Sequence, residues 1–339
     1  MAVLAEGQSH HGPESSSVPP KIEGSFKGQD ILSFDQLDPN SLDHLFSFVP
    51  EMKRIALNAE PSDILAGTIS YLLFYEPSSR TRGSFEAALK QLHGEAVVEG
   101  DPIHYSSVAK GESFEDTIRT YESYSDMIIL RHPEVGAAKR AAAAAEHVPI
   151  INAGDGIGEH PTQALLDLYT IKEHTGRLDN LSVVAGGDIL NGRTIHSLLK
   201  GLALYPGNRV HLLAPDALRL GAEEAQGYRD KGLEIVEING MDEIPKTADI
   251  WYWTRVQRER MMHLNEEEYI DLRDKFIVTP EVMEQFAGEN TGLMHPLPRV
   301  GEIEPSVDKD PRALYLRTQV RNGMYVRMAL ASLVLGKIE

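Results

Sequence analysis

Short apolar runs alternate with longer stretches of helical periodicity along most of the chain, starting at about residue 28. The apolar runs predict strands at 68–74, 96–98, 127–130, 148–152, 181–185, 209–213, 250–253 and 292–294. The stretches between them predict helices near 79–92, 112–124, 134–146, 160–174, 192–204 and 216–230. Because strands that alternate with helices at this spacing pair in parallel, the pattern predicts an α/β fold.

Eight strands are more than one small sheet holds, so we expect two doubly wound parallel-sheet domains. The predicted helix at 160–174 is long enough to bridge them. The last helical stretch, at about 320–335, has no strand after it and could pack on either domain. In open parallel sheets, ligands bind beyond the carboxyl ends of the strands, so the segments that follow strands are the candidates for chemistry.

Composition narrows the class of protein. The 339 residues carry 33 Lys and Arg against 51 Asp and Glu, and this net charge of −18 opposes binding to nucleic acid or to an anionic membrane surface. The chain has no cysteine, which excludes thiolate metal sites and cysteine nucleophiles. With no signal-peptide pattern and no long apolar run, we expect a cytoplasmic protein. Residues 1–24, rich in Ser, Gly, Pro and His, predict a disordered extension.

The segment after the first predicted strand has the features of an anion site. It reads Ser78-Ser79-Arg80-Thr81-Arg82 and opens a predicted helix, with a serine as the natural N-cap. A helix N-terminus presents unpaired N–H groups and attracts phosphate. Because cations are electrostatically unfavourable there, the two arginines favour a bound anion over the alternative, a capped helix with exposed arginines.

A histidine opens the predicted bridging helix. Pro161 suits the first helical turn, which puts His160 at or beside the N-cap, where the helix dipole disfavours imidazolium. A neutral histidine there can donate to a carbonyl oxygen. Gln163, one turn further, can reach the same ligand. The alternative is a histidine that only caps the helix or fills the core.

The segment after the strand at 181–185 resembles a nucleotide-binding loop but departs from it. Gly187 and Gly192 stand five apart and Thr194 is where that loop needs Ser or Thr, yet position 193 is arginine instead of lysine. The planar guanidinium of Arg193 suits a carboxylate better. A nucleotide hydrolase therefore stays as a weaker alternative.

Further cations follow other predicted strands. Arg131, Arg255 and the segment at 295–299 each come directly after an apolar run, and Lys110 precedes a helix in the loop that contains Ser106. Any one arginine alone could be a surface ion pair. Together they suit two small anions held side by side, one of them a phosphate, with catalysis by positioning and charge stabilisation. We expect no metal and no cofactor.

These junctions resemble the aspartate/ornithine carbamoyltransferase family over residues 31–336. The segments at 78–82 and 160–163 are similar to the whole family. Two further segments are similar to its aspartate branch: Thr-Arg-Val-Gln at 254–257 and His-Pro-Leu-Pro-Arg at 295–299. In the ornithine branch, the second of these segments would read His-Cys-Leu-Pro. An ornithine-type enzyme is the alternative within the family.

The resemblance implies transfer of a carbamoyl group from carbamoyl phosphate to L-aspartate, giving N-carbamoyl-L-aspartate and phosphate, early in pyrimidine (UMP) biosynthesis. It implies a carbamoyl phosphate-binding domain of residues 25–161 plus 318–339, so that the C-terminal helix returns to the first domain, and an aspartate-binding domain of residues 162–317. It also implies a homotrimer with shared active sites, which a larger assembly with regulatory chains could contain.

The resemblance gives each donor-side residue a role. Phosphate would be held by Ser78, Ser79, Arg80 and Thr81. The carbamoyl oxygen would be bound by Thr81, Arg131 and His160. The carbamoyl amide would donate to Gln163 and to the main-chain carbonyl of Leu297, before a cis bond to Pro298.

The remaining implied roles concern the acceptor and the neighbouring subunit. Aspartate carboxylates would be bound by Arg193, Arg255 and Gln257. Ser106 and Lys110 would enter from the neighbouring subunit. The catalytic set would be Arg80, Thr81, Lys110, Arg131 and His160. In the closed state, Glu76 would pair with Arg193 and Arg260 across the gap between the domains. The chain departs from the family at two places, with Ser79 where threonine is usual and Ala109 where many members have lysine.

Overall fold

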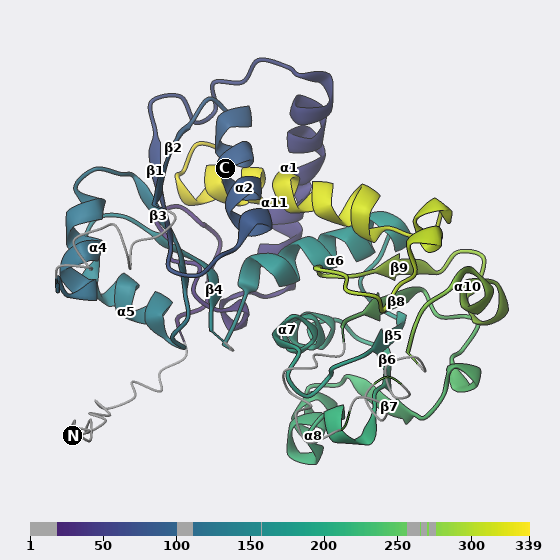
Figure 1. Ribbon diagram of the computed structural model, residues 1–339. Coiled ribbons are helices and arrows are strands. Elements are labelled where there is room, and N and C mark those ends of the chain that lie inside the picture. Colours follow the sequence, from purple (N-terminus) through teal and green to yellow (C-terminus); the bar gives the residue numbers. More distant parts are fainter. Residues whose placement is uncertain (1–18, 100–110, 157, 256–264, 266–269, 271–275) are drawn as a thin grey trace, which may run out of the picture.

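The computed structural model describes residues 19–99, 111–156, 158–255, 265, 270 and 276–339 (Figure 1). The strands of the first sheet are β1 (Ile69–Phe74), β2 (Glu95–Glu99), β3 (Met127–His132) and β4 (Ile150–Asp155). Those of the second are β5 (Ser182–Gly186), β6 (Arg209–Leu213), β7 (Glu234–Ile238), β8 (Ile250–Trp253) and β9 (Gly292–Met294). The orders are β2-β1-β3-β4 and β7-β6-β5-β8-β9, with every neighbouring pair parallel. The predicted α/β fold with two parallel sheets is confirmed.

Helices surround both sheets. They are α1 (Pro39–Asn58), α2 (Ser79–Gln91), α4 (Phe114–Glu122), α5 (Ala137–Ala144), α6 (Pro161–Thr175), α7 (Arg193–Leu202), α8 (Ala222–Asp230), α10 (Pro280–Phe286) and α11 (Val320–Val334). The C-terminal α11 packs against α1 and α2 of the first half, as expected, and also against α6. Among the residues that the structure describes, no helix combines the length and apolar character that crossing a bilayer requires.

Helix α6 lies between the two halves (Figure 1). Its first three turns are buried almost continuously, from Pro161 to Ile171. A helix that is buried on all sides packs against elements on every face, which suits a bridge between two domains. The predicted domain boundaries, after residues 161 and 317, fall inside α6 and the π-helical turn at Tyr315–Gln319, and they stay predictions.

Each predicted strand and each predicted helix is present, but four segments differ. Helices α1 and α10 and strand β7 were not predicted. The helix predicted at 216–230 starts only at Ala222, because Asp216–Leu218 forms a separate 3-10 turn. Strand β7 is at the edge of its sheet and is only partly buried, so its apolar pattern is weak.

The predicted disordered extension is too long at its C-terminal end. Residues 1–18 lie outside the described part of the chain, but Ile22 is 3% exposed and its N–H donates to the carbonyl of Gln36 at 2.9 Å. One buried isoleucine within a polar segment does not change its average composition, which is why composition placed the boundary too late.

In both sheets, the direction in which successive strands are added reverses beside an inner strand. In the first sheet the chain leaves β1 for β2 on one side and continues with β3 on the other; in the second, β5 has the same place between β6 and β8. Loops that diverge from two neighbouring strand ends leave room for a ligand at such switch points. The candidate anion-binding residues predicted from the sequence lie at these switch points. They are in the segments at the start of α2, at the end of β3, and after β5 and β8.

A substitution at Gly187, directly after β5, tests this arrangement of the strand ends. Its φ is +112°, and an added Cβ would lie 2.2 Å from the carbonyl oxygen of Thr254 at the end of β8. We expect Gly187→Ala to lower the free energy of unfolding by about 3 kcal/mol, from backbone strain and overlap together. Gly221→Ala, where nothing lies within 4 Å, should change it by less than about 1 kcal/mol. Urea unfolding monitored by fluorescence measures both, and equal stabilities would contradict the close approach of these two strand ends.

Candidate active site

The N-terminus of α2 opens into a cavity of about 380 Å³. Ser78 is the N-cap as predicted, but its hydroxyl makes no capping hydrogen bond. Ser78, Ser79, Arg80 and Thr81 all line the cavity. The first helical N–H groups and these side chains therefore form a site for a small anion. Arg82, the second arginine of this turn, does not contribute to the lining.

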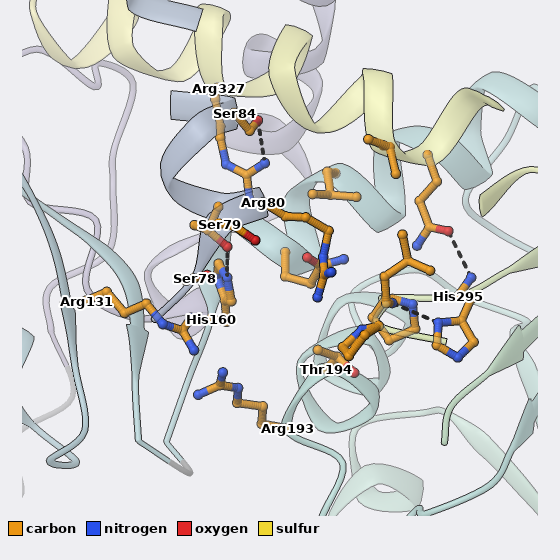
Figure 2. Close-up of a pocket in the computed structure, with 18 of the residues that line it drawn as sticks. Ser78, Ser79, Arg80, Ser84, Arg131, His160, Arg193, Thr194, His295 and Arg327 are labelled. Carbon is orange, nitrogen blue, oxygen red and sulfur yellow. Dashed lines mark hydrogen bonds between the residues drawn. The ribbon is translucent and has the colours of Figure 1, made fainter. Parts of the chain in front are cut away.

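Arg131 from β3 and His160 from the start of α6 meet this helix terminus (Figure 2). Arg131, in β3, donates to the carbonyl of Ala153 at 3.1 Å and lies 3.3 Å from the carboxylate of Glu76. His160 is the N-cap of α6 and is 4% exposed, with its Nε2 3.4 Å from the Thr81 hydroxyl. This places an imidazole and a guanidinium beside the anion site, as the sequence predicts.

Burial and neighbouring cations keep His160 uncharged. Burial lowers its pKa well below the ordinary value, and Arg327, Arg193 and Arg131 lower the pKa further. Burial and Arg193 also lower the pKa of the Arg131 guanidinium, although Glu76 opposes this. The cavity is thus a region of positive potential that favours anions and a neutral imidazole.

The second half of the protein supplies the opposite wall. Arg193 begins α7, and its guanidinium donates to the carbonyl of Gly156. Figure 2 shows Arg131 and Arg193 pointing toward one another from opposite sides. Arg193 also lines an adjoining cavity of about 510 Å³, to which Thr254 and Arg255 belong. Two connected cavities therefore lie between the halves, one at the helix terminus and one beside Arg255.

The loop after β9 lines both cavities. Within it, the Leu297 N–H donates to His295 Nδ1 at 2.7 Å, and the peptide bond from Leu297 to Pro298 is cis, as the resemblance implies. His295 Nε2 lies 2.6 Å from Glu302. Arg299 does not reach either cavity, because its guanidinium pairs with Asp308.

The structure gathers most of the predicted site residues. The first cavity is lined by Ser78, Ser79, Arg80, Thr81, Arg131, His160, Gln163, Arg193, Leu297 and Pro298, and the second by Arg255. Ser106, Lys110, Gln257 and Arg260 lie outside the described residues. Glu76, expected beside Arg193 in the closed state, here lies 3.3 Å from Arg131, and its pairing in the closed state stays a prediction. In the described part of the chain, no group of three or more His, Asp or Glu side chains could hold a metal ion.

Sequence reasoning missed three polar residues that line the first cavity: Ser84, Gln319 and Arg327. Arg327, in α11, is 3% exposed, donates to Ser84 at 3.0 Å and to Thr162 at 3.3 Å, and stacks on the Phe85 ring. Burial lowers its pKa to about 10, although Asp167 opposes the shift. A single arginine inside an apolar helical run was the signal that could have identified it.

Comparison with known protein families gives two adjacent matches. Residues 29–173 match the aspartate/ornithine carbamoyltransferase carbamoyl-P binding domain, and residues 179–334 match the Asp/Orn binding domain. The chain belongs to the aspartate/ornithine carbamoyltransferase family. The second match includes the glycine loop at 187–194, so the nucleotide-hydrolase alternative has no support.

Relatives of this carbamoyltransferase span nearly all of its chain. Aspartate carbamoyltransferase 1, chloroplastic, of Pisum sativum is 44% identical over 91% of this chain and 79% of its own length. The aspartate carbamoyltransferase catalytic subunit of Methanopyrus kandleri is 44% identical over 92% and 99%. The multifunctional protein pyr1-3 of Dictyostelium discoideum is 45% identical, but the match spans 14% of its length.

Solved structures agree with this family assignment. Aspartate transcarbamoylase from Trypanosoma cruzi in complex with N-(phosphonacetyl)-L-aspartic acid superposes on the carbamoyltransferase with a TM-score of 0.84 at 39% identity, covering 91% of this chain and 97% of that chain. The catalytic subunit of M. jannaschii aspartate transcarbamoylase gives 0.85 at 38% identity, with coverage of 91% and 98%.

The depressed pKa of His160 makes stability depend on pH. Below about pH 6.5 the unfolded chain binds a proton at His160 that the folded carbamoyltransferase does not bind, so stability falls as pH drops. We expect the wild type to lose about 1.4 kcal/mol per pH unit below 6.5 relative to His160→Gln. Parallel urea-unfolding series from pH 7.5 to 5.5 measure the difference. Identical pH dependences of the two proteins would show that His160 is not held neutral.

Proposed function

We propose that this carbamoyltransferase transfers the carbamoyl group of carbamoyl phosphate to the amine of L-aspartate, giving N-carbamoyl-L-aspartate and phosphate, a step of pyrimidine biosynthesis. One observation carries the proposal: the anion site at the start of α2 opens beside a neutral His160 and adjoins a cavity that contains Arg255. The relatives described above are named aspartate carbamoyltransferases, and one Trypanosoma cruzi enzyme is solved with carbamoyl phosphate and aspartate.

The phosphate of the donor fits the N-terminus of α2. Ser78, Ser79 and Thr81 offer hydroxyl donors there and Arg80 offers a permanent charge. These groups join the free N–H groups of the first turn, so negative charge that develops on the departing phosphate is stabilised without any rearrangement.

The carbamoyl carbonyl lies toward Arg131, His160 and Thr81 in this proposal. A neutral imidazole and a guanidinium that both donate to the carbonyl oxygen stabilise the charge that develops on it. The carbamoyl NH2 then donates to Gln163 and to the carbonyl of Leu297, which line the same cavity. The five groups fix the plane of the carbamoyl group.

Aspartate occupies the second cavity, with Arg193 and Arg255 on its carboxylates. Gln257, outside the described residues, completes this set in the proposal. An ornithine side chain would bring a cation to these arginines, so the charge favours aspartate over the ornithine branch. The amine nitrogen attacks the carbamoyl carbon, the bond from that carbon to the phosphate oxygen breaks, and the amine proton passes to the leaving phosphate.

A homotrimer with shared sites is part of the proposal. Strand β2 is at the edge of the first sheet, and Val97 and Val98 are 41% and 37% exposed there. Exposed apolar side chains on an edge strand suit an interface. The same strand leads into residues 100–110, which carry Ser106 and Lys110 and which we assign to a neighbour's site. A cytoplasmic location and further regulatory chains also remain proposals, and the plant relatives are chloroplastic.

Arg80→Ala should lower kcat/KM for carbamoyl phosphate by about 10²–10³, because it removes a charged donor from the departing phosphate. Arg82→Ala is the matched control, since it removes a cation from the same helical turn but outside the cavity, and it should stay within threefold of the wild type. A colorimetric assay of carbamoyl-aspartate measures both, with ornithine as the alternative acceptor. Near-normal turnover by Arg80→Ala, or faster reaction with ornithine, would contradict the proposal.

Shared sites make subunit mixing informative. Arg80→Ala and Lys110→Ala proteins should each be nearly inactive, because each lacks one donor at every site. After mixed dissociation and reassociation, hybrid trimers contain some sites with both residues intact, so activity should return to about a quarter of the wild-type value or less. Carbamoyl-aspartate production after mixing measures this. Absence of recovery, with trimers confirmed by light scattering, would rule out sharing between subunits.

A further inference from the structure

A buried carboxylate lies directly behind the cavity and outside its lining. Asp167, in α6, has no exposed surface. Its Oδ1 accepts hydrogen bonds from the amide nitrogens of Gln163 at 3.0 Å and of Gln319 at 2.7 Å, and its Oδ2 accepts from the Tyr252 hydroxyl at 2.8 Å. Burial raises the pKa of Asp167 to about 7, although these donors oppose the shift.

The orientation of Gln319 is fixed independently of Asp167. Its Oε1 accepts from the backbone N–H of His295 at 2.9 Å, and a backbone N–H can only donate. The amide nitrogen of Gln319 must therefore face Asp167, and Oδ1 must act as an acceptor there. Figure 2 shows the hydrogen bond that ends at His295.

The orientation of Gln163 follows from this. An Oδ1 that accepts from Gln319 carries no proton, so its contact with Gln163 is also an N–H donation. The conclusion holds for a protonated Asp167 as well, because the proton then lies on Oδ2, where the Tyr252 hydroxyl can accept it. Because its nitrogen is bound to Asp167, Oε1 is the amide atom with which Gln163 can accept from a ligand in the cavity that it lines.

The same carboxylate also holds the loop after β9. Asp167 binds Gln319, Gln319 binds the N–H of His295, and His295 accepts from the N–H of Leu297. Both acceptors assigned to the carbamoyl NH2, the Gln163 oxygen and the Leu297 carbonyl, are thus connected to one oxygen of Asp167.

We propose that Asp167 is the positioning residue that makes the site select an acyl phosphate bearing N–H groups. It turns two hydrogen-bond acceptors, the Gln163 oxygen and the Leu297 carbonyl, toward the cavity. A ligand NH2 donates to both acceptors, whereas a methyl group in its place leaves both without a donor. The inference rests on the function proposed above. Acetyl phosphate is the matched probe, because it replaces the carbamoyl NH2 by CH3 and keeps the phosphate and carbonyl. A site that requires hydrogen bonds from its substrate rejects analogues without the donor.

The test compares kcat/KM for carbamoyl phosphate with the inhibition constant of acetyl phosphate, both with aspartate as acceptor. In Asp167→Ala, we expect kcat/KM to fall about tenfold or more while the acetyl phosphate constant changes less than threefold. Asp167→Asn keeps an oxygen at the Oδ1 position and should retain both values within threefold. Tyr252→Phe removes only the Oδ2 contact and is the matched control, with both values again within threefold.

A purely structural role predicts a different outcome. If Asp167→Ala weakens both values equally, or if Asp167→Asn or Tyr252→Phe behaves like Asp167→Ala, the inference is wrong. If circular dichroism shows that Asp167→Ala does not fold, the variants Asp167→Asn and Gln319→Met test the inference instead. Asp167→Asn must retain both kcat/KM and the acetyl phosphate constant. Gln319→Met must lower kcat/KM at least threefold and leave the acetyl phosphate constant unchanged. A wild type that forms no carbamoyl-aspartate would overturn the proposed function itself, whereas an active wild type with insensitive variants would overturn this inference alone.

Discussion

Repulsion between positive charges that share one buried cavity is the constraint on which the rest of this site depends. Arg131, Arg193 and Arg327 reach it from β3, α7 and α11, and all three lower the pKa of His160. Such a cluster is unfavourable until an anion occupies it, which makes the empty fold electrostatically suited to a doubly charged phosphate. Burial, and after it the same repulsion, lowers the pKa of His160 and keeps the imidazole neutral, so it can donate to a carbonyl without competing for the phosphate.

Carboxylates limit this repulsion without entering the anion site. Glu76 lies 3.3 Å from Arg131, on the side that faces the second cavity. Asp167 stands behind Gln163 and partly offsets the burial of Arg327. Glu302 is buried, which raises its pKa, but the hydrogen bond with His295 and other donors bring the net pKa below the usual range. Each carboxylate thus acts through a cation or a polar side chain, and the charge that meets the ligand stays positive.

The parts of the site that the sequence predicts are those set by local structure. Ser78 and His160 are recognisable because each caps a helix that follows an apolar strand, and Arg131 because it lies near the end of one. Helix α1 carried a local signal, the capping box of Asp38 and Ser41, that went unused.

Arg327 and Gln319 could not be placed in this way. They reach the cavity only because α11 folds back over α1 and α2, a tertiary contact between residues far apart in the sequence. Which strand neighbours which, and hence which junctions meet at a switch point, is likewise a property of the assembled sheets. Local pattern therefore identifies candidate groups, and topology decides which of them share a ligand.

Helix α7 shows how the two halves are held in register at the site. Arg193 at its start binds the carbonyl of Gly156, and Lys200 binds Glu159 at 2.8 Å and Asp35 at 2.9 Å. Arg193 and Lys200 are seven residues apart, which is about two helical turns. Both side chains therefore project from one face of α7, about 10 Å apart along the helix axis. They contact the two ends of the segment that leads into His160. One helix of the second half therefore fixes where Arg193 lies relative to the imidazole of His160, and the bridge through α6 need not supply that precision alone.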